Sequence, residues 1–227
     1  MSLSRGESKD PFAELLLVYP ARQIPKNRPL LFQGEIPSMV FYVKSGTVKL
    51  YNITSQGEEK IVGYESQGSF LPLEWLFDHA PVSLYYCDTF TDCEVIRVPK
   101  AELLSLVKHS QPAAQKFLER SVSMYIGATM HLHALEQSKV RQKLVAILQY
   151  LVVRFGQPAG PNQIKIDLRL THQEIANLLG ATRETISTEL SKLSKDGVVK
   201  VNNSEYTINT DRAQRLLGED DFRELKL

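Results

Sequence analysis

Short runs of alternating hydrophobic and polar residues fill the chain from Leu30 to Val98. Alternation with a period of two predicts strands that bury one face. Four such runs are divided by glycines that permit tight turns: the runs are Val40–Lys44, Thr47–Tyr51, Lys60–Tyr64 and Glu94–Val98, and the glycines are Gly34, Gly46, Gly57 and Gly68. This spacing predicts an antiparallel roll or barrel. Before it, residues 1–10 are polar and expected to be loose, and residues 11–19 predict a short amphipathic helix.

A helical period replaces the alternation after Pro112, a residue that suits the first turn of a helix. Apolar residues then recur at roughly helical spacing, with no further proline as far as residue 154: Leu118, Val122, Ile126, Leu132, Leu135, Leu144, Ile147, Leu148 and Leu151. One helix of about 40 residues would be about 60 Å long, more than one small domain can cover. The pattern predicts pairing with the same helix of a second chain, and Gly127 and Ala128 would permit close approach.

Residues 171–194 predict a helix, a tight turn and a second helix. Thr171 with Glu174 three residues later forms a capping box, which fixes the start of the first helix. Gly180 supplies the backbone freedom to end that helix, and Thr182 is a good N-cap for the next one. Two apolar stripes face inward, one of Ile175, Leu178 and Leu179 and one of Ile186, Leu190 and Leu193, while Ala176 allows the helices to cross closely.

The outward residues of the second helix are polar and concentrated in its first two turns, where a helix inserted into a major groove meets base edges. Arginine can grip guanine through two hydrogen bonds, and a carboxylate can accept one from the cytosine amino group. We predict that eight residues contact DNA, with His172 on phosphate: Thr171, His172, Thr182, Arg183, Glu184, Ser187, Thr188 and Lys192. The plainer alternative is an ordinary solvated helical hairpin.

Two short alternating runs follow, at residues 197–201 and 206–208, around a turn of Asn202, Asn203, Ser204 and Glu205. Such a pattern predicts a β-hairpin. A hairpin placed directly after a recognition helix is a wing, so the sequence predicts a winged helix-turn-helix.

The stretch from Leu170 to Ile186 resembles the DNA-binding domain of the bacterial cyclic-AMP receptor protein and fumarate-nitrate regulator (Crp/Fnr) family, through its Gln173-Glu-Ile and Arg183-Glu-Thr cores. In that family the Arg and Glu read bases, and a second base-reading Arg commonly stands where this chain has Thr188. That departure bears on the operator sequence. Residues Gly34-Glu35, Phe41–Val48 and Gly68-Ser-Phe70 resemble the family's cyclic-nucleotide-binding fold.

The resemblance implies an α+β protein with three parts: an antiparallel β-roll that senses an effector at 11–111, a long dimerisation helix at 112–155, and a winged helix-turn-helix at 156–227. It implies a homodimer that binds double-stranded DNA at an inverted repeat, with RNA polymerase as a further partner. A rival hypothesis keeps the DNA binding but treats the roll as a scaffold without a ligand.

The nucleotide pocket departs from the resemblance. Family receptors that bind cyclic nucleotides carry a Gly-Glu-Leu turn for the ribose and an Arg-Ser pair for the phosphate; here these places read Pro72-Leu73-Glu74 and Ser83-Leu84, and no arginine lies between Arg28 and Arg97. A buried phosphate without a cationic partner is costly, so we expect cyclic AMP not to bind in that way. No cofactor is predicted, and the effector is unknown.

The residues around this place are largely apolar and aromatic, which suits an apolar or aromatic effector. The candidate pocket comprises Phe70, Leu73, Glu74, Trp75, Ser83, Leu84 and Tyr85. The alternative is that these rings fill the core of the roll.

Net charge is only +1, but residues 137–203 hold 10 Lys and Arg against 5 Asp and Glu, a modest excess that agrees with DNA binding. There is no apolar run long enough to span a membrane and no secretion signal, so we expect a cytoplasmic protein. If Tyr85 to Val98 is extended, Cys87 and Cys93 face the same side of one strand; structural thiols are expected, and a redox pair, which needs close approach, is the alternative.

Two cysteines cannot supply the four thiolates of an iron-sulfur cluster. Haem is less firmly excluded by the sequence, although His79, His109, His131 and His133 are expected at the surface or in packing. A cupin-type metalloenzyme is the alternative from another class, but it needs two His and a Glu on barrel strands, and the strand region holds only His79.

Overall fold

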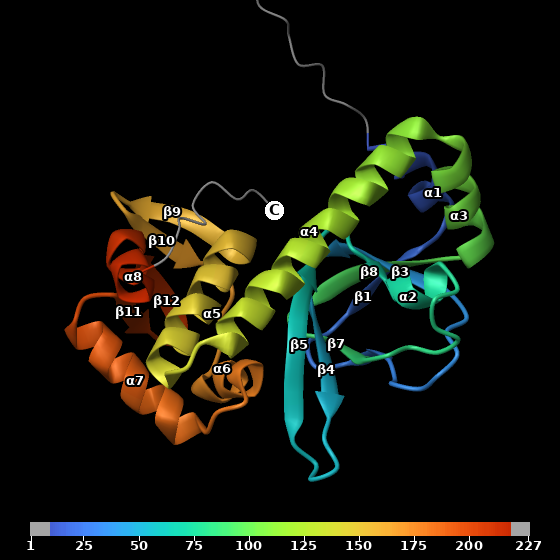
Figure 1. Ribbon diagram of the computed structural model, residues 1–227. Coiled ribbons are helices and arrows are strands. Elements are labelled where there is room, and N and C mark those ends of the chain that lie inside the picture. Colours follow the sequence, from blue (N-terminus) through green and yellow to red (C-terminus); the bar gives the residue numbers. More distant parts are fainter. Residues whose placement is uncertain (1–9, 219–227) are drawn as a thin grey trace, which may run out of the picture. The chain divides into compact units, whose positions relative to one another are not determined.

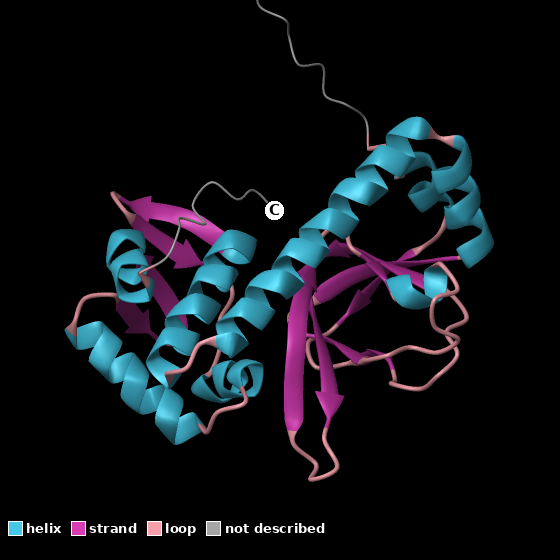
Figure 2. Ribbon diagram, viewed as in Figure 1, coloured by secondary structure: helices cyan, strands magenta, loops and turns pink. Residues whose placement is uncertain are grey.

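The computed structural model describes residues 10–218, which divide into two units. Strands and helices come largely in separate runs along the chain, an α+β arrangement (Figure 2). The first unit covers residues 10–52 and 64–122, and the second covers 53–63 and 123–218. Each unit is described separately below.

Two four-stranded sheets lie mainly in the first unit, although their residues 53 and 59–63 fall in the second, and every strand pair given for them is antiparallel. One sheet runs in the order β1 (Ala21–Ile24), β8 (Cys93–Val98), β3 (Val40–Ser45) and β6 (Phe70–Leu71). The other runs β2 (Pro29–Leu31), β7 (Tyr86–Thr89), β4 (Thr47–Ile53) and β5 (Glu59–Ser66). The four strand runs expected from the sequence are confirmed.

Glycine at position 46 makes the turn between β3 and β4. Its φ is +86°, and a Cβ there would overlap the carbonyl oxygen of Asp92 and lie 2.7 Å from Cys93 Sγ. The turn therefore needs both the left-handed backbone and the missing side chain.

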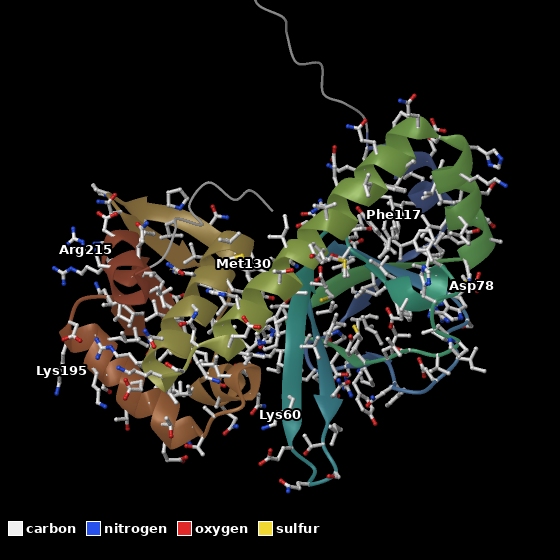
Figure 3. All side chains as sticks on the ribbon, in the orientation of Figure 1. Lys60, Asp78, Phe117, Met130, Lys195 and Arg215 are labelled. Carbon is white, nitrogen blue, oxygen red and sulfur yellow. The ribbon has the colours of Figure 1, made fainter. Side chains whose placement is uncertain are left out.

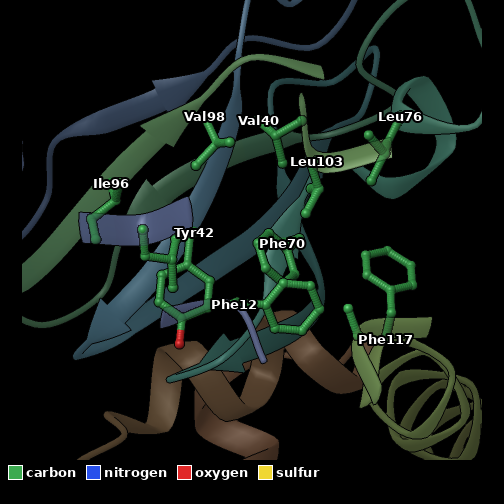
Figure 4. Close-up of a cluster of buried hydrophobic side chains, with 11 residues drawn as sticks. Phe12, Val40, Tyr42, Phe70, Leu76, Ile96, Val98, Leu103 and Phe117 are labelled. Carbon is green, nitrogen blue, oxygen red and sulfur yellow. The ribbon is translucent and has the colours of Figure 1, made fainter. Parts of the chain in front are cut away.

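Helices cover one face of the β3–β8 sheet: α1 (Ala13–Val18), α2 (Leu73–Leu76), α3 (Lys100–His109) and the start of α4 (Gln111–Glu136). The apolar core between them contains 11 buried residues (Figure 4). Phe70 lies within it, with its ring centroid 4.9 Å from those of Phe12 and Tyr42 and 5.7 Å from that of Phe117. This packing joins α1, the sheet and α4 into one body, and α1 confirms the helix expected in residues 11–19.

Cys87 and Cys93 do not share a strand. The expected single strand from Tyr85 to Val98 is wrong, because residues 90–92 separate β7 from β8 and the two strands belong to different sheets. Both thiols are buried, and desolvation is the main cause that raises the pKa of each. Buried thiols with raised pKa values are poor nucleophiles.

The helix expected across residues 112–155 is broken in two. After α4 ends at Glu136, Lys139 adopts an extended backbone, and α5 runs from Val140 to Phe155. The Nζ of Lys143 donates to the carbonyl oxygen of Leu135, one of those left open where α4 ends. No proline or glycine marks the break, so the apolar period alone could not locate it.

Helix α5 packs with the C-terminal elements rather than continuing α4. It buries Leu144, Val145, Ala146, Ile147, Leu148, Tyr150 and Leu151, nearly every side of the helix, and contacts β9, β10, α6, α7 and α8. Gly127 of α4 faces α5, because a Cβ there would lie 3.5 Å from Tyr150 and Arg154. The expectation that Gly127 serves a second chain is therefore wrong, whereas Ala128 is exposed.

The rest of the second unit is a helix-turn-helix on a sheet, coloured yellow to red in Figure 1. Its helices are α6 (His172–Leu179), α7 (Arg183–Lys195) and α8 (Thr210–Leu217). Its sheet runs β11 (Val199–Asn202), β12 (Glu205–Asn209), β10 (Gln163–Ile166) and β9 (Gly156–Gly160). The wing strands β11 and β12 are confirmed. Strands β9 and β10 were not expected, because residues 156–160 carry no alternation and two glycines with a proline.

Candidate nucleic-acid interface

Helix α6 begins at a complete capping box. The backbone N–H of Glu174 donates to Thr171 Oγ1 at 3.2 Å, and the backbone N–H of Thr171 donates to Glu174 Oε2 at 2.6 Å. The Thr171 hydroxyl also donates to Oε2 at 2.8 Å. These bonds satisfy N–H groups that have no partner within the helix. The hydroxyl of Thr171 is therefore already engaged, and its contribution to a DNA interface is first to fix where α6 starts.

The turn after α6 depends on Gly180. Its φ is +64°, and its N–H donates to the carbonyl oxygen of Ala176. Thr182 then caps α7, since the N–H of Thr185 donates to its Oγ1 at 3.2 Å. The predicted helix, turn and N-cap are confirmed at the same residues.

One side of α7 is buried through Ile186, Leu190 and Leu193. The other side presents the predicted DNA residues of this helix: Arg183, Glu184, Thr188 and Lys192 are exposed and Ser187 is half-buried. Lys192 pairs with Glu189 at 2.7 Å on the same helix. Because the apolar side of α7 is buried, its polar side chains point away from the core.

His172 lies beside this set at the first position of α6. Its pKa is lowered by desolvation first and by the charge of Arg183 second. The fold thus brings the predicted phosphate contact and the predicted base contact near each other. Both causes disfavour the protonated ring, and a phosphate between the two side chains would offset the effect of Arg183 and favour the protonated form.

The wing is joined to the start of α6. Asn203 and Ser204 both have positive φ, as a tight two-residue hairpin turn requires. The N–H of Leu170 donates to the carbonyl oxygen of Ser204 at 3.1 Å, and the Tyr206 hydroxyl donates to that of Leu170 at 2.8 Å. Two hydrogen bonds therefore tie the wing to the residue that precedes the N-cap of α6.

Sequence reasoning missed Arg169 and Lys165, which both pair with Glu205 of the wing at 2.9 Å. Hydrogen bonds from Lys165 and then from Arg169 lower the pKa of Glu205. The signal was available, because Arg169 stands two residues before the N-cap of α6. Lys195 and Arg215 project from α7 and α8 (Figure 3) and add exposed cations.

Comparison with known proteins agrees with this geometry. The sequence pattern of the Crp-like helix-turn-helix domain matches residues 142–216, and that of the cyclic nucleotide-binding domain matches residues 21–110. Together the two ranges take in most of the chain. The chain belongs to the Crp/Fnr family of transcription regulators. Like other members of this family, it is a DNA-binding regulator rather than an enzyme.

Individual Crp/Fnr relatives align along most of their length. The global nitrogen regulator of Synechocystis is 26% identical over 185 residues, covering 81% of this chain and 82% of the relative. The fumarate and nitrate reduction regulatory protein of Escherichia coli K12 is 29% identical over 200 residues, covering 87% and 78%. The structure of FixK2 from Bradyrhizobium japonicum superposes with a TM-score of 0.73 at 20% identity, covering 89% of this chain and 99% of that one.

In this Crp/Fnr chain the predicted effector residues divide into two groups. Phe70 is buried in the apolar core, and Leu73 and Trp75 pack against it. These three side chains therefore lie where the alternative hypothesis put them, in or against the apolar core of the roll.

The second group is polar or exposed. Glu74 Oε1 accepts from the N–H of Leu84 at 3.2 Å, and the Ser83 hydroxyl donates to the carbonyl oxygen of Tyr85 at 2.8 Å. Leu84 is itself exposed. The Glu74 carboxylate and the Ser83 hydroxyl thus already have hydrogen-bond partners in the backbone of residues 84 and 85.

The histidines considered for haem also have other contacts. Both ring nitrogens of His131 lie within hydrogen-bond distance of backbone carbonyls, and Nδ1 of His109 contacts the carbonyl oxygen of Ser105. His133 contacts Gln137, and His79 is exposed. Among residues 10–218, no group of three His, Cys, Asp or Glu is arranged to hold a metal ion. In the same range, no helix is both long enough and apolar enough to cross a bilayer.

Proposed function

We propose that this Crp/Fnr regulator reads an inverted-repeat operator as a homodimer. The observation that carries the proposal is the exposed pair Arg183 and Glu184 in the first turn of a helix whose base is capped and packed. Arg183 donates two hydrogen bonds to a guanine, and Glu184 accepts from a cytosine. Thr188 stands one turn further along and offers a methyl group and a hydroxyl where relatives carry a second Arg.

Helix α4 supports the second copy of the chain in this proposal. Its 26 residues span about 39 Å, and one stripe of apolar side chains on it is exposed: Leu118, Val122, Tyr125, Leu132 and Leu135. The steps from 118 to 122, 125 and 132 follow a heptad, the pattern of a helix paired with its own copy. The opposite side is buried through Ala113, Phe117, Met130 and Ala134.

Sedimentation equilibrium tests the dimer. We expect the natural chain to be a dimer at micromolar concentration, and the Leu118→Glu, Tyr125→Glu double variant to be a folded monomer with an unchanged circular dichroism spectrum. Lys116→Glu, at an exposed position of the same helix outside this heptad register, introduces the same side chain and is the matched control. A natural chain that sediments as a monomer would refute the homodimer.

Selection from random double-stranded DNA tests the operator. Two copies of α7 related by a two-fold axis would meet major grooves about 34–36 Å apart. The expected product is a palindrome whose half-sites share a G·C pair. Enrichment of single, unpaired half-sites, or of no motif, would contradict the proposal.

We further infer that the roll takes a small effector other than cyclic AMP. The support is chemical: Ser83 and Leu84 stand where receptors place Arg and Ser, and Glu74 is held by the Leu84 N–H. A cyclic phosphate would find no cation in this segment. The competing hypothesis is regulation without a ligand.

A thermal-shift screen of metabolites, followed by operator titration with each hit, separates these hypotheses. A ligand that changes operator affinity must bind one arrangement of the protein better than another. No shift with cyclic AMP and a shift with another compound is the expected result. Action in the cytoplasm, where the DNA lies, and contact with RNA polymerase follow from the same role and stay predictions.

A further inference from the structure

His131 connects four elements of the second unit. It lies on α4 next to Met130, labelled in Figure 3, and its side chain is buried. Its Nδ1 is 2.9 Å from the carbonyl oxygen of Val62 on β5, and its Nε2 is 2.8 Å from that of Leu178 on α6. The ring also stacks on Tyr150 of α5, with centroids 5.8 Å apart and planes at 18°.

These two contacts require two N–H donors, because a carbonyl oxygen carries no hydrogen. A neutral imidazole has one N–H and one lone pair, so one of the two contacts would set a lone pair against an oxygen. The imidazolium ion has two N–H groups and satisfies both. Leu178 also lies in the last turn of α6, where open carbonyls and the negative end of the helix dipole favour a cation.

Two charged residues lie on elements that contact His131, one on α5 and one on β5. Arg154 of α5 lies with Tyr150 against Gly127, one turn before His131. From β5, Glu59 accepts a hydrogen bond at 3.3 Å from Asn177, the neighbour of Leu178.

Other ionisable groups lie elsewhere on these elements, among them Glu65 of β5, which accepts from the Ser69 hydroxyl at 2.9 Å, and Lys143 of α5, which donates to the carbonyl oxygen of Leu135. On α6, His172 and Glu174 lie at the opposite end, and on α4, His133 contacts Gln137. On β5, Lys60 pairs with Glu58 at 2.9 Å. The two carbonyl oxygens in hydrogen-bond contact with the ring favour its positive charge.

We propose that His131 is a positioning residue for the DNA-binding helices: as an imidazolium ion it clamps the hairpin of residues 53–63 to the end of α6. The proposal rests on the DNA-binding role of α6 and α7. The hydrogen bond between Asn177 and Glu59 is a second tie between the same two elements. When the ring gives up its second proton, one carbonyl loses its donor and the hairpin separates more readily from α6.

The charge state is tested directly by NMR of the full chain labelled with ¹⁵N-histidine. At pH 6 we expect both ring nitrogens of His131 to carry a proton and to be hydrogen-bonded to the two carbonyls. A ring that carries a single proton at pH 6 overturns the proposal.

Hydrogen exchange measured by mass spectrometry tests the clamp. After correction for intrinsic rates, exchange in residues 53–63 and at the end of α6 is expected to be about tenfold faster at pH 8 than at pH 6, equivalent to about 1.4 kcal/mol. His131→Gln should remove this pH dependence, because glutamine does not titrate. His133→Gln, two residues away on α4, should keep it. Equal pH profiles for the natural chain and His131→Gln would overturn the proposal.

Operator titration connects the clamp to function. The pH dependence of operator affinity should be smaller in His131→Gln than in the natural chain, and unchanged in His133→Gln. An unaltered pH dependence in His131→Gln would refute the positioning role. The NMR and exchange measurements need no DNA, so a chain that passes both but binds no inverted repeat would refute the proposed operator and not the clamp.

Discussion

His172 and Arg183 begin the two helices of the helix-turn-helix, and the guanidinium of Arg183 disfavours a positive charge on the imidazole of His172. Burial of the ring is the larger cause of its lowered pKa, and Arg183 is the second. The two residues that sequence analysis assigned separately to phosphate and to bases are therefore coupled electrostatically in the free protein.

This coupling predicts that Arg183→Ala raises the pKa of His172 towards its usual 6.5 without reaching it, because burial remains. Arg183→Lys keeps the charge and should leave the pKa lowered. Since the folded state holds the proton less tightly than the unfolded state, His172 favours folding above pH 6.5 and this contribution is lost as the pH falls through the lowered pKa. An NMR pH titration of both variants measures the effect, and identical His172 curves in Arg183→Ala and the natural chain would contradict it.

If Arg183 reads a base, Arg183→Ala should lose operator affinity and base preference together. Removal of a two-pronged contact to guanine should weaken operator binding by roughly 1–3 kcal/mol and relax the preference at one base pair. Lys195→Ala, at the far end of α7, is the control and should leave base preference intact. Fluorescence anisotropy on operators substituted at each position measures both effects. A uniform loss on unrelated DNA would instead identify Arg183 as a phosphate contact.

The capping box predicts that Thr171→Ala destabilises the fold by roughly 0.5–2 kcal/mol, because the N–H of Glu174 loses its acceptor. Thr171→Ser keeps the hydroxyl and should recover most of the loss. Urea denaturation followed by circular dichroism gives both free energies of unfolding. Equal stability of the Ala variant and the natural chain would show that water replaces the cap without cost.

Gly180 and Gly46 both have left-handed backbones, but replacement by alanine should destabilise the fold by different amounts at the two positions. At Gly180 an added Cβ meets nothing within 4 Å, so Gly180→Ala should cost only the backbone strain, about 1–2 kcal/mol. At Gly46 the same strain is joined by overlap with Asp92 and Cys93, so Gly46→Ala should cost clearly more. The comparison uses the same denaturation experiment, and a larger loss at position 180 than at position 46 would contradict the assignment.

The helix-turn-helix could be predicted almost residue by residue because its determinants are local. A threonine three residues before a glutamate, a glycine in the left-handed region and apolar residues three or four apart act within a few turns of chain. All of these lie where the sequence placed them, and so does the wing.

Interactions between distant residues were decided by the tertiary structure alone. The break after Glu136 exists because α5 is apolar on nearly all sides and packs into the C-terminal unit, which no local signal records. Phe70 belongs to a core built with Phe12 and Phe117, from segments far apart in sequence. The two carbonyls at His131 come from positions 69 and 47 residues away. The sequence by itself determined the helix-turn-helix, its wing and the four strand runs of the roll, whereas the surroundings of His131, Phe70 and the two thiols depend on which elements pack together.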